Sequence, residues 1–191
     1  MGRPLQFDAD AAVETAMGVF WRNGYNGTTP QALTTELGIG KGSLYYTFES
    51  KHNLFVLSLA RYKSWRTEFL SANFSGSAPV RTQLRGAVEV LTGYGDHDRG
   101  CLLVNASAEL GGADPMVADV TGALFAVIED AFRDAIRRGQ DEGELDPACD
   151  AEAEASALLT TVIGTSLLLK ARTDQRRVAR TIDARLESLQ H

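Results

Sequence analysis

The residues best suited to specific chemistry form the segment Lys41–Lys51, which reads Lys-Gly-Ser-Leu-Tyr-Tyr-Thr-Phe-Glu-Ser-Lys. Basic, hydroxyl and small side chains come first, and two adjacent tyrosines follow. Ammonium and hydroxyl groups donate hydrogen bonds to phosphate oxygens. A helix that begins with short residues can approach the major groove of DNA closely. The chemistry that we expect of this segment is therefore the binding of a nucleic acid.

Patterns that would indicate catalysis are weak. The glycines of Gly38–Gly42 suggest a phosphate-binding loop, but a P-loop needs Gly-Lys followed directly by Ser or Thr, after a strand. The chain contains no Gly-x-Ser-x-Gly nucleophile elbow. The run Asp96–Asp98 is spaced too closely to make a good metal cage. We therefore expect no enzyme, no cofactor and no metal site, and turnover of a bound small molecule would contradict this expectation.

Composition and charge favour a folded cytoplasmic protein. The 191 residues are 44% hydrophobic and 23% charged, which is ordinary for a globular chain. We find no apolar run near the ~20 residues of a membrane span and no apolar signal segment at the N-terminus. Two cysteines, Cys101 and Cys149, make no disulfide framework. The net charge is −6, yet residues 1–66 hold seven Lys or Arg against five Asp or Glu, so a mildly basic head precedes an acidic body.

Apolar periodicity and capping residues predict an all-α fold. Thr29-Pro30 is typical of a helix start, because a hydroxyl caps the helix and proline fits its first turn. The expected helices lie near 8–23, 29–37, 41–47, 51–73, 80–94, 100–110, 115–139, 149–172 and 174–189. Residues 29–47 thus form a helix, a short turn with two glycines, and a second helix. This is a helix-turn-helix pattern.

The segment from Thr28-Thr29 through Leu37-Gly38-Ile39 to Lys51 resembles the DNA-binding domain of TetR-family transcriptional regulators. The resemblance implies a helix-turn-helix domain over 1–50 and a helical effector-binding and dimerisation domain over 51–191. It implies that Leu44 and Phe48 hold the recognition helix in place. The side chains that it places against DNA are Thr28 or Thr29, Tyr45, Tyr46 and Lys51 for phosphates, and Lys41, Gly42, Ser43 and Thr47 for base edges. Arg3 belongs either to an arm in the minor groove or to an unordered tail.

The body is expected to hold an effector pocket. The residues that we expect to line it are Trp65, Phe69, Tyr94, Cys101, Asn105 and Phe125, and each has the alternative role of a core residue. An apolar body favours a hydrophobic effector. Gly100-Cys101 resembles a helix start in one TetR subgroup, where a cysteine senses electrophiles or oxidants. The alternative is that Cys101 fills a gap in the core.

The last two helices are expected to form a homodimer interface. The residues assigned to it are a small-residue stripe, Ala153, Ala157, Thr161 and Thr165, and an apolar stripe, Val178, Ile182, Leu186 and Leu189. The resemblance therefore predicts a bacterial, nucleoid-associated repressor that binds a near-palindromic operator as a dimer and is released by a small molecule. The alternative is a TetR-like ligand-binding protein that acts through protein partners without binding DNA.

Overall fold

The computed structural model describes residues 7–94 and 99–190, which fold into nine α-helices and one short 3-10 helix and contain no strand. The all-α expectation is therefore confirmed, and each expected helix is found with its ends shifted by at most two residues. The helices are α1 Ala9–Asn23, α2 Pro30–Leu37, α3 Lys41–Phe48, α4 Lys51–Phe74, α5 Val80–Thr92, α6 Leu102–Leu110, α7 Pro115–Asp141, α8 Ala151–Lys170 and α9 Gln175–Glu187.

Local capping explains where the first helices begin. The side chains of Asp8, Thr29 and Ser50 each accept a backbone N–H at the start of α1, α2 and α4. Gly38 ends α2 in the left-handed conformation, with φ +64°, which glycine adopts without a steric penalty. Gly40 precedes α3 and offers no side-chain cap, so the start of α3 depends on packing.

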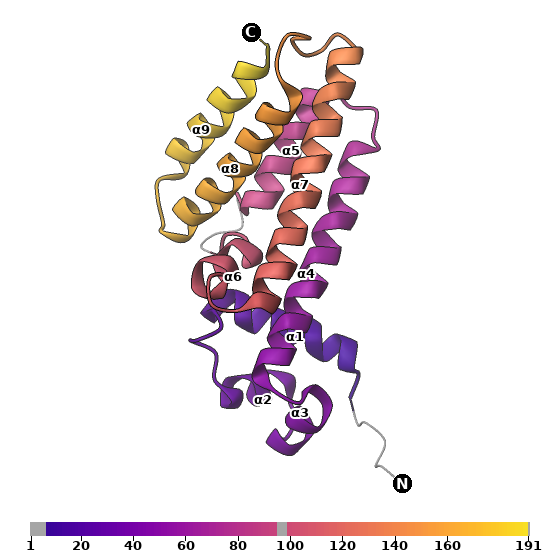
Figure 1. The fold of residues 1–191 in the computed structure, drawn as a ribbon. Coiled ribbons are helices and arrows are strands. Elements are labelled where there is room, and N and C mark those ends of the chain that lie inside the picture. The colour runs from indigo at the N-terminus through magenta and orange to yellow at the C-terminus, as the bar shows by residue number, and fades with distance from the viewer. Residues whose placement is uncertain (1–6, 95–98, 191) are drawn as a thin grey trace.

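Helix α4 joins the N-terminal head (residues 7–50) to the body (residues 75–94 and 99–190). Its 24 residues span about 36 Å at 1.5 Å per residue. Figure 1 shows α4 rising from the head and running beside α7, while α1 crosses its lower end. Helix α6 lies at the junction, in contact with α1, α4 and α7. Helices α4 and α6 therefore connect the body to the head through direct helix contacts.

Helix α8 lies within the helical body. Among the described residues, α8 is the one helix whose length and composition would allow it to cross a membrane. The sequence alone did not predict this. A core helix of a soluble protein meets the same criteria. Helix α8 packs against α7, α5 and α9, and Glu152 and Glu154 lie in its first turn. We therefore interpret it as a core helix.

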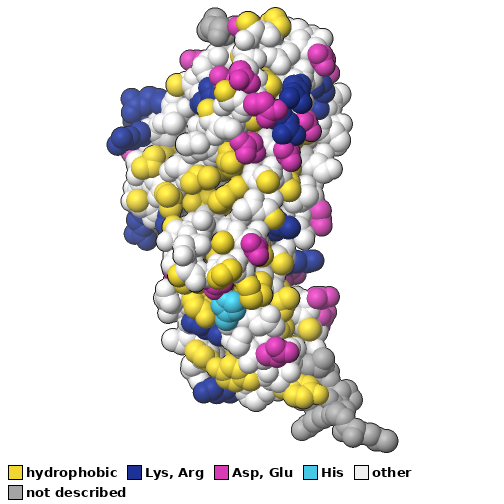
Figure 2. All heavy atoms as spheres, viewed as in Figure 1, with side chains coloured by type: hydrophobic (Ala, Val, Ile, Leu, Met, Phe, Trp, Pro, Cys, Tyr) yellow, Lys and Arg dark blue, Asp and Glu magenta, His cyan; other side chains and the backbone are white. Residues whose placement is uncertain are grey.

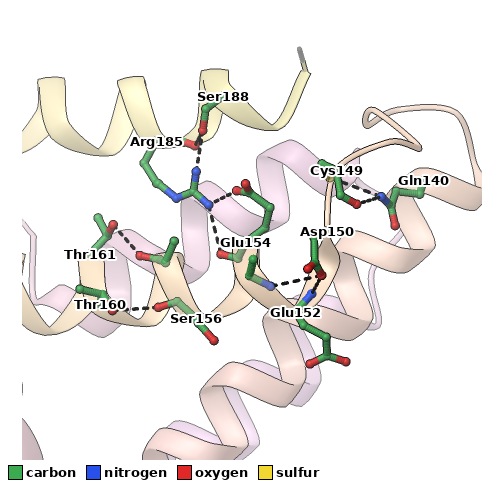
Figure 3. Close-up of polar contacts among 12 residues, drawn as sticks. Gln140, Cys149, Asp150, Glu152, Glu154, Ser156, Thr160, Thr161, Arg185 and Ser188 are labelled. Atoms are coloured by element: carbon green, nitrogen blue, oxygen red, sulfur yellow. Dashed lines mark hydrogen bonds and ion pairs between the residues drawn. The ribbon is translucent and has the colours of Figure 1, made fainter.

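Helix α9 is attached to α8 by polar and apolar contacts. Figure 3 shows Arg185 of α9 directed at Glu154 of α8 and at Ser188. Burial of the Arg185 guanidinium lowers its pKa, although arginine remains charged at neutral pH. The side chains of Arg185 and Glu154 are 16% and 23% exposed, so this ion pair is largely removed from water. It anchors the C-terminal helix.

Candidate nucleic-acid interface

The helix α3 presents one face to its own domain and another to solvent. Leu44 and Phe48 are only 1% and 3% exposed, and they fix α3 in the core of the head. Lys41, Gly42 and Ser43 are exposed on the first turn. These three residues form the N-terminal turn of α3. The N-terminal residues of a recognition helix are the ones that contact base edges. The structure thus leaves free the face that the sequence assigned to DNA.

Tyr45 and Tyr46 follow on the same helix. Tyr46 is 74% exposed and Tyr45 is 37% exposed, so both hydroxyls are accessible to a partner of α3. Thr47 differs, because its hydroxyl oxygen is buried and has no hydrogen-bond partner among the described residues. The expected contact of Thr47 with a base edge therefore needs a rotated side chain.

Two adjacent threonines have different surroundings. Thr28 is 1% exposed, and its hydroxyl donates to the Gly24 carbonyl at 2.6 Å. Thr29 is exposed, and its hydroxyl oxygen caps α2 by accepting from the Ala32 N–H at 3.1 Å. The hydroxyl proton of Thr29 remains available for a phosphate. The structure thus removes Thr28 from the expected contacts and keeps Thr29.

The role of Lys51 has to be revised. Its ammonium donates to the carbonyls of Tyr25 and Thr28, both at 3.0 Å, and lies 4.0 Å from the centre of the Tyr25 ring. Two of its three protons are therefore engaged within the head. Lys51 closes the loop 24–28 between α1 and α2 (the α1–α2 loop), a role that the phosphate-contact prediction missed. Arg3 lies outside the described residues.

Three polar residues at the junction of head and body were not identified from the sequence. Glu109, near the end of α6, accepts hydrogen bonds from the backbone N–H groups of Tyr25 and Asn26. His52 of α4 lies 2.5 Å from the carboxylate of Asp114, the cap of α7. The hydrogen bond from His52 lowers the pKa of Asp114, despite an opposing effect of burial. Burial and the nearby Asp114 charge raise the pKa of Tyr25.

The six residues expected to line an effector pocket are distributed over different surroundings. Trp65 and Phe69 line a hollow of about 390 Å³ on α4, together with Arg66, Glu68 and Ala72. Asn105 lines another hollow, of about 380 Å³, beside Gly24, Glu109 and Lys170. Tyr94 and Phe125 are partly buried against the core. Among the hollows lined by described residues, none holds all six of these residues.

Cys101 lies in the core. It is 2% exposed, and the hydroxyl of Tyr62 donates to its sulfur at 3.6 Å. Burial, with a smaller effect of the cysteine, raises the pKa of Tyr62 well above its usual value. The Trp21 indole N–H donates to the Gly100 carbonyl at 2.9 Å, which fixes the start of this segment. These contacts favour the packing role of Cys101.

The residues expected at the dimer interface divide into two sets. Val178, Ile182, Leu186 and Leu189 are at most 1% exposed, because α9 packs this stripe against α5 and α8 of its own chain. Thr165 is 2% exposed. Their assignment to the interface was wrong, since a second copy cannot reach them. Ala153 is exposed, and Ala157 and Thr161 are partly exposed, so one face of α8 stays accessible.

The surface charge differs along the molecule. Figure 2 shows acidic and basic side chains intermixed over the upper part of the body in this view, and hydrophobic, basic and acidic side chains together near the lower end of the head. No group of three or more His, Cys, Asp or Glu side chains among the described residues is arranged to hold a metal ion. The run Asp96–Asp98, which the sequence made a poor candidate for a metal cage, lies outside the described residues.

Comparison with known families and structures gives matches over both parts of the chain. Residues 12–56 match the model for bacterial regulatory proteins of the tetR family. Residues 79–185 match the tetracyclin repressor-like C-terminal domain.

Individual relatives match over most of their length. The uncharacterized HTH-type transcriptional regulator YezE of Bacillus subtilis (strain 168) is 28% identical, over 99% of this chain and 100% of its own. The HTH-type transcriptional repressor ComR of Escherichia coli (strain K12) is 28% identical, over 87% and 81%. A cysteine mutant of the TetR family transcriptional regulator CifR, solved with 26-base-pair operator DNA, is 30% identical with a TM-score of 0.82, over 98% and 100%.

Proposed function

Because the chain belongs to the tetR family of bacterial regulatory proteins, we propose that it represses transcription by binding an operator as a homodimer, until a small molecule releases it. The observation that carries this proposal is the solvent-facing first turn of α3, held rigidly by Leu44 and Phe48. CifR, a similar protein, has been solved on operator DNA, which supports the same mode here. The place of action is the bacterial cytoplasm.

We assign the DNA contacts to the expected residues whose side chains are exposed on the head. Lys41, Gly42 and Ser43 would face base edges, since they are exposed at the start of the recognition helix. Tyr45, Tyr46 and Thr29 would contact phosphates through their hydroxyls. Substitution Tyr46→Ala should weaken binding to every DNA sequence, whereas Lys41→Ala should relax base preference.

A homodimer would place two recognition helices on one duplex. The accessible stripe of α8, which includes Ala153, Ala157 and Thr161, offers small side chains that allow two helices to approach closely. Leu167 and Leu168, which are 40% and 37% exposed, extend this face towards the end of α8. A two-fold dimer would read a near-palindromic operator, because each half-site meets one copy of α3.

A hydrophobic effector would bind in the body. The hollow beside Trp65 and Phe69 has a volume within the range of small-molecule sites, and Trp65 is 52% exposed. By linkage, an effector weakens DNA binding only as far as it prefers the conformation that does not bind DNA. Replacing Trp21 with Phe would leave Trp65 as the one tryptophan, whose fluorescence then reports on ligands in this hollow.

The direct test is selection of bound duplexes from a randomised DNA pool with the purified protein at moderate salt. We expect an inverted repeat to be enriched, and we expect Tyr46→Ala to abolish the enrichment. Glu14→Gln, which changes an exposed residue of α1, serves as the matched control and should select the same repeat. A folded protein that enriches no sequence would contradict the proposal and favour a ligand-binding protein that acts through protein partners.

A further inference from the structure

The α1–α2 loop is bound by a carboxylate from the body. One oxygen of Glu109 accepts from the Tyr25 N–H at 2.9 Å, and the other accepts from the Asn26 N–H at 2.8 Å. Consecutive N–H groups that point to one side form a concave site for an anion. Gly24 has φ +74°, and a Cβ there would lie 2.9 Å from the same carboxylate. The backbone therefore fits closely around Glu109.

The opposite side of this loop is bound by a cation from the first turn of α4. Lys51 donates to the carbonyls of Tyr25 and Thr28, so a single loop is held by a negative group at its N–H side and a positive group at its C=O side. The loop leads directly into Thr29, which caps α2. The position of the loop therefore sets where the helix-turn-helix begins.

We propose that Glu109 is a positioning residue for DNA binding, through which α6 holds the head in the orientation that reads the operator. The proposal rests on the proposed function. The hydrogen bond between His52 of α4 and Asp114, four residues after α6 ends, makes a second attachment at this junction. Displacement of α6 would withdraw both carboxylate oxygens from the loop at once. The α1–α2 loop would then keep its Lys51 contacts on α4 and be free to move relative to α6.

The direction in which DNA affinity changes when Glu109 is replaced distinguishes this positioning role from a simple effect of charge. Glu109 is acidic, so its removal makes the junction less negative and, by charge alone, strengthens attraction to DNA. A positioning role predicts the opposite, weaker binding of the specific duplex. Glu14→Gln removes an equal charge from the head, where the carboxylate pairs with Arg61 at 3.2 Å on an exposed surface. It provides the matched control.

The experiment compares Glu109→Gln, Glu109→Ala and Glu14→Gln on two fluorescent duplexes. One carries the sequence that the wild-type protein enriches, and the other is its scrambled form. We expect Glu109→Gln to weaken the specific duplex about tenfold, a Kd shift typical of one lost charged contact, and Glu109→Ala to weaken it further. The effect of Glu109→Gln should be the smaller of the two, because the glutamine amide keeps one oxygen that can accept a hydrogen bond from the loop. Binding to the scrambled duplex should not weaken, so the ratio of the two affinities falls, whereas partial unfolding would lower both affinities equally.

Hydrogen exchange of the free protein provides the second readout. The amides of Tyr25 and Asn26 should exchange faster in both Glu109 variants and at the wild-type rate in Glu14→Gln. Unchanged exchange at these two amides, or faster exchange with an unchanged affinity ratio, would overturn the proposal. A wild-type protein that enriches no duplex would overturn the proposed function, whereas enrichment with wild-type behaviour of both Glu109 variants would overturn this inference alone.

Discussion

The substitution Lys51→Met tests whether this lysine holds the α1–α2 loop or neutralises a phosphate. Methionine keeps most of the apolar stem and removes the ammonium. The structure gives that ammonium two backbone carbonyls at 3.0 Å and an aromatic ring at 4.0 Å. A lysine committed to these partners contributes to the stability of the head in the absence of DNA. A lysine that serves DNA alone contributes to it little.

The expected cost follows from these contacts. Net contributions of about 1.5–3 kcal/mol are typical for hydrogen bonds to charged groups. A cation over an aromatic ring adds about 0.5–1 kcal/mol at an accessible site. The ammonium is only partly buried and is hydrated in the unfolded chain, so we take about 2 kcal/mol for the whole set. For a chain of this length, that corresponds to a fall in Tm of about 4–8 °C.

The assay combines thermal unfolding with the salt dependence of DNA affinity. A lysine that neutralises one phosphate contributes about 0.9 to the slope of log K against log salt. We expect the slope to stay unchanged while the Tm falls. Lys170→Met, which changes an exposed lysine at the end of α8, should alter neither quantity. A slope reduced by about one, together with an unchanged Tm, would refute the loop-holding role.

Three further predictions concern the junction and α9. Gly24→Ala should destabilise the protein by about 1–3 kcal/mol, because φ +74° with ψ 176° is a backbone region that essentially only glycine adopts, and the new Cβ would also lie 2.9 Å from the Glu109 carboxylate; chemical unfolding should show a smaller loss for Gly143→Ala, which has φ +76° and open space. Asp114→Asn should lower the free energy of unfolding above about pH 5. The difference from the wild-type protein should vanish as the pH falls through the lowered pKa of Asp114, because a carboxyl group with a lowered pKa stabilises the fold only while it is ionised. A deficit that persists at low pH would disprove the assignment. Glu154→Ala should cost about 3 kcal/mol, because it leaves the largely buried Arg185 without its acid. Asp183→Ala, which breaks a more exposed pair with Arg85, should cost less than about 1 kcal/mol. Equal losses in denaturant unfolding would argue against burial as the cause.

The sequence predicted the helices and the exposed face of α3, because these features depend on neighbouring residues. The cap at Thr29, the glycine at Gly38 and the spacing of Leu44 and Phe48 act within one or two turns. The role of Glu109 was not predictable in this way. Its partners lie 83 and 84 residues earlier in the chain, and an acid near a helix end gives no signal that distinguishes an anchor from a solvated residue.

The apolar stripe of α9 shows a related limit. Spacing identified Val178, Ile182 and Leu186 as one face of an amphipathic helix, and the structure buries that face. Periodicity does not reveal whether the covering surface belongs to the same chain or to a second copy. On α8, Ala153 and Ala157 of the predicted stripe of small residues remain accessible, whereas Thr165 of the same stripe is buried. Burial within one chain therefore decides which of two equally patterned helices is available to a partner.

Opposite charges on the two sides of one loop have a mechanistic consequence. Lys51 belongs to the first turn of α4, next to the head, whereas Glu109 belongs to α6. If α6 shifts, the carbonyl side of the loop stays attached while the N–H side loses its partner. The loop then keeps its contacts within the head but loses its tether to the body, so the head can reorient without unfolding. In such a regulator, release from the operator requires the loss of only a few hydrogen bonds at this loop. The free energy of these bonds lies within the range of about 1–3 kcal/mol that is typical of allosteric coupling.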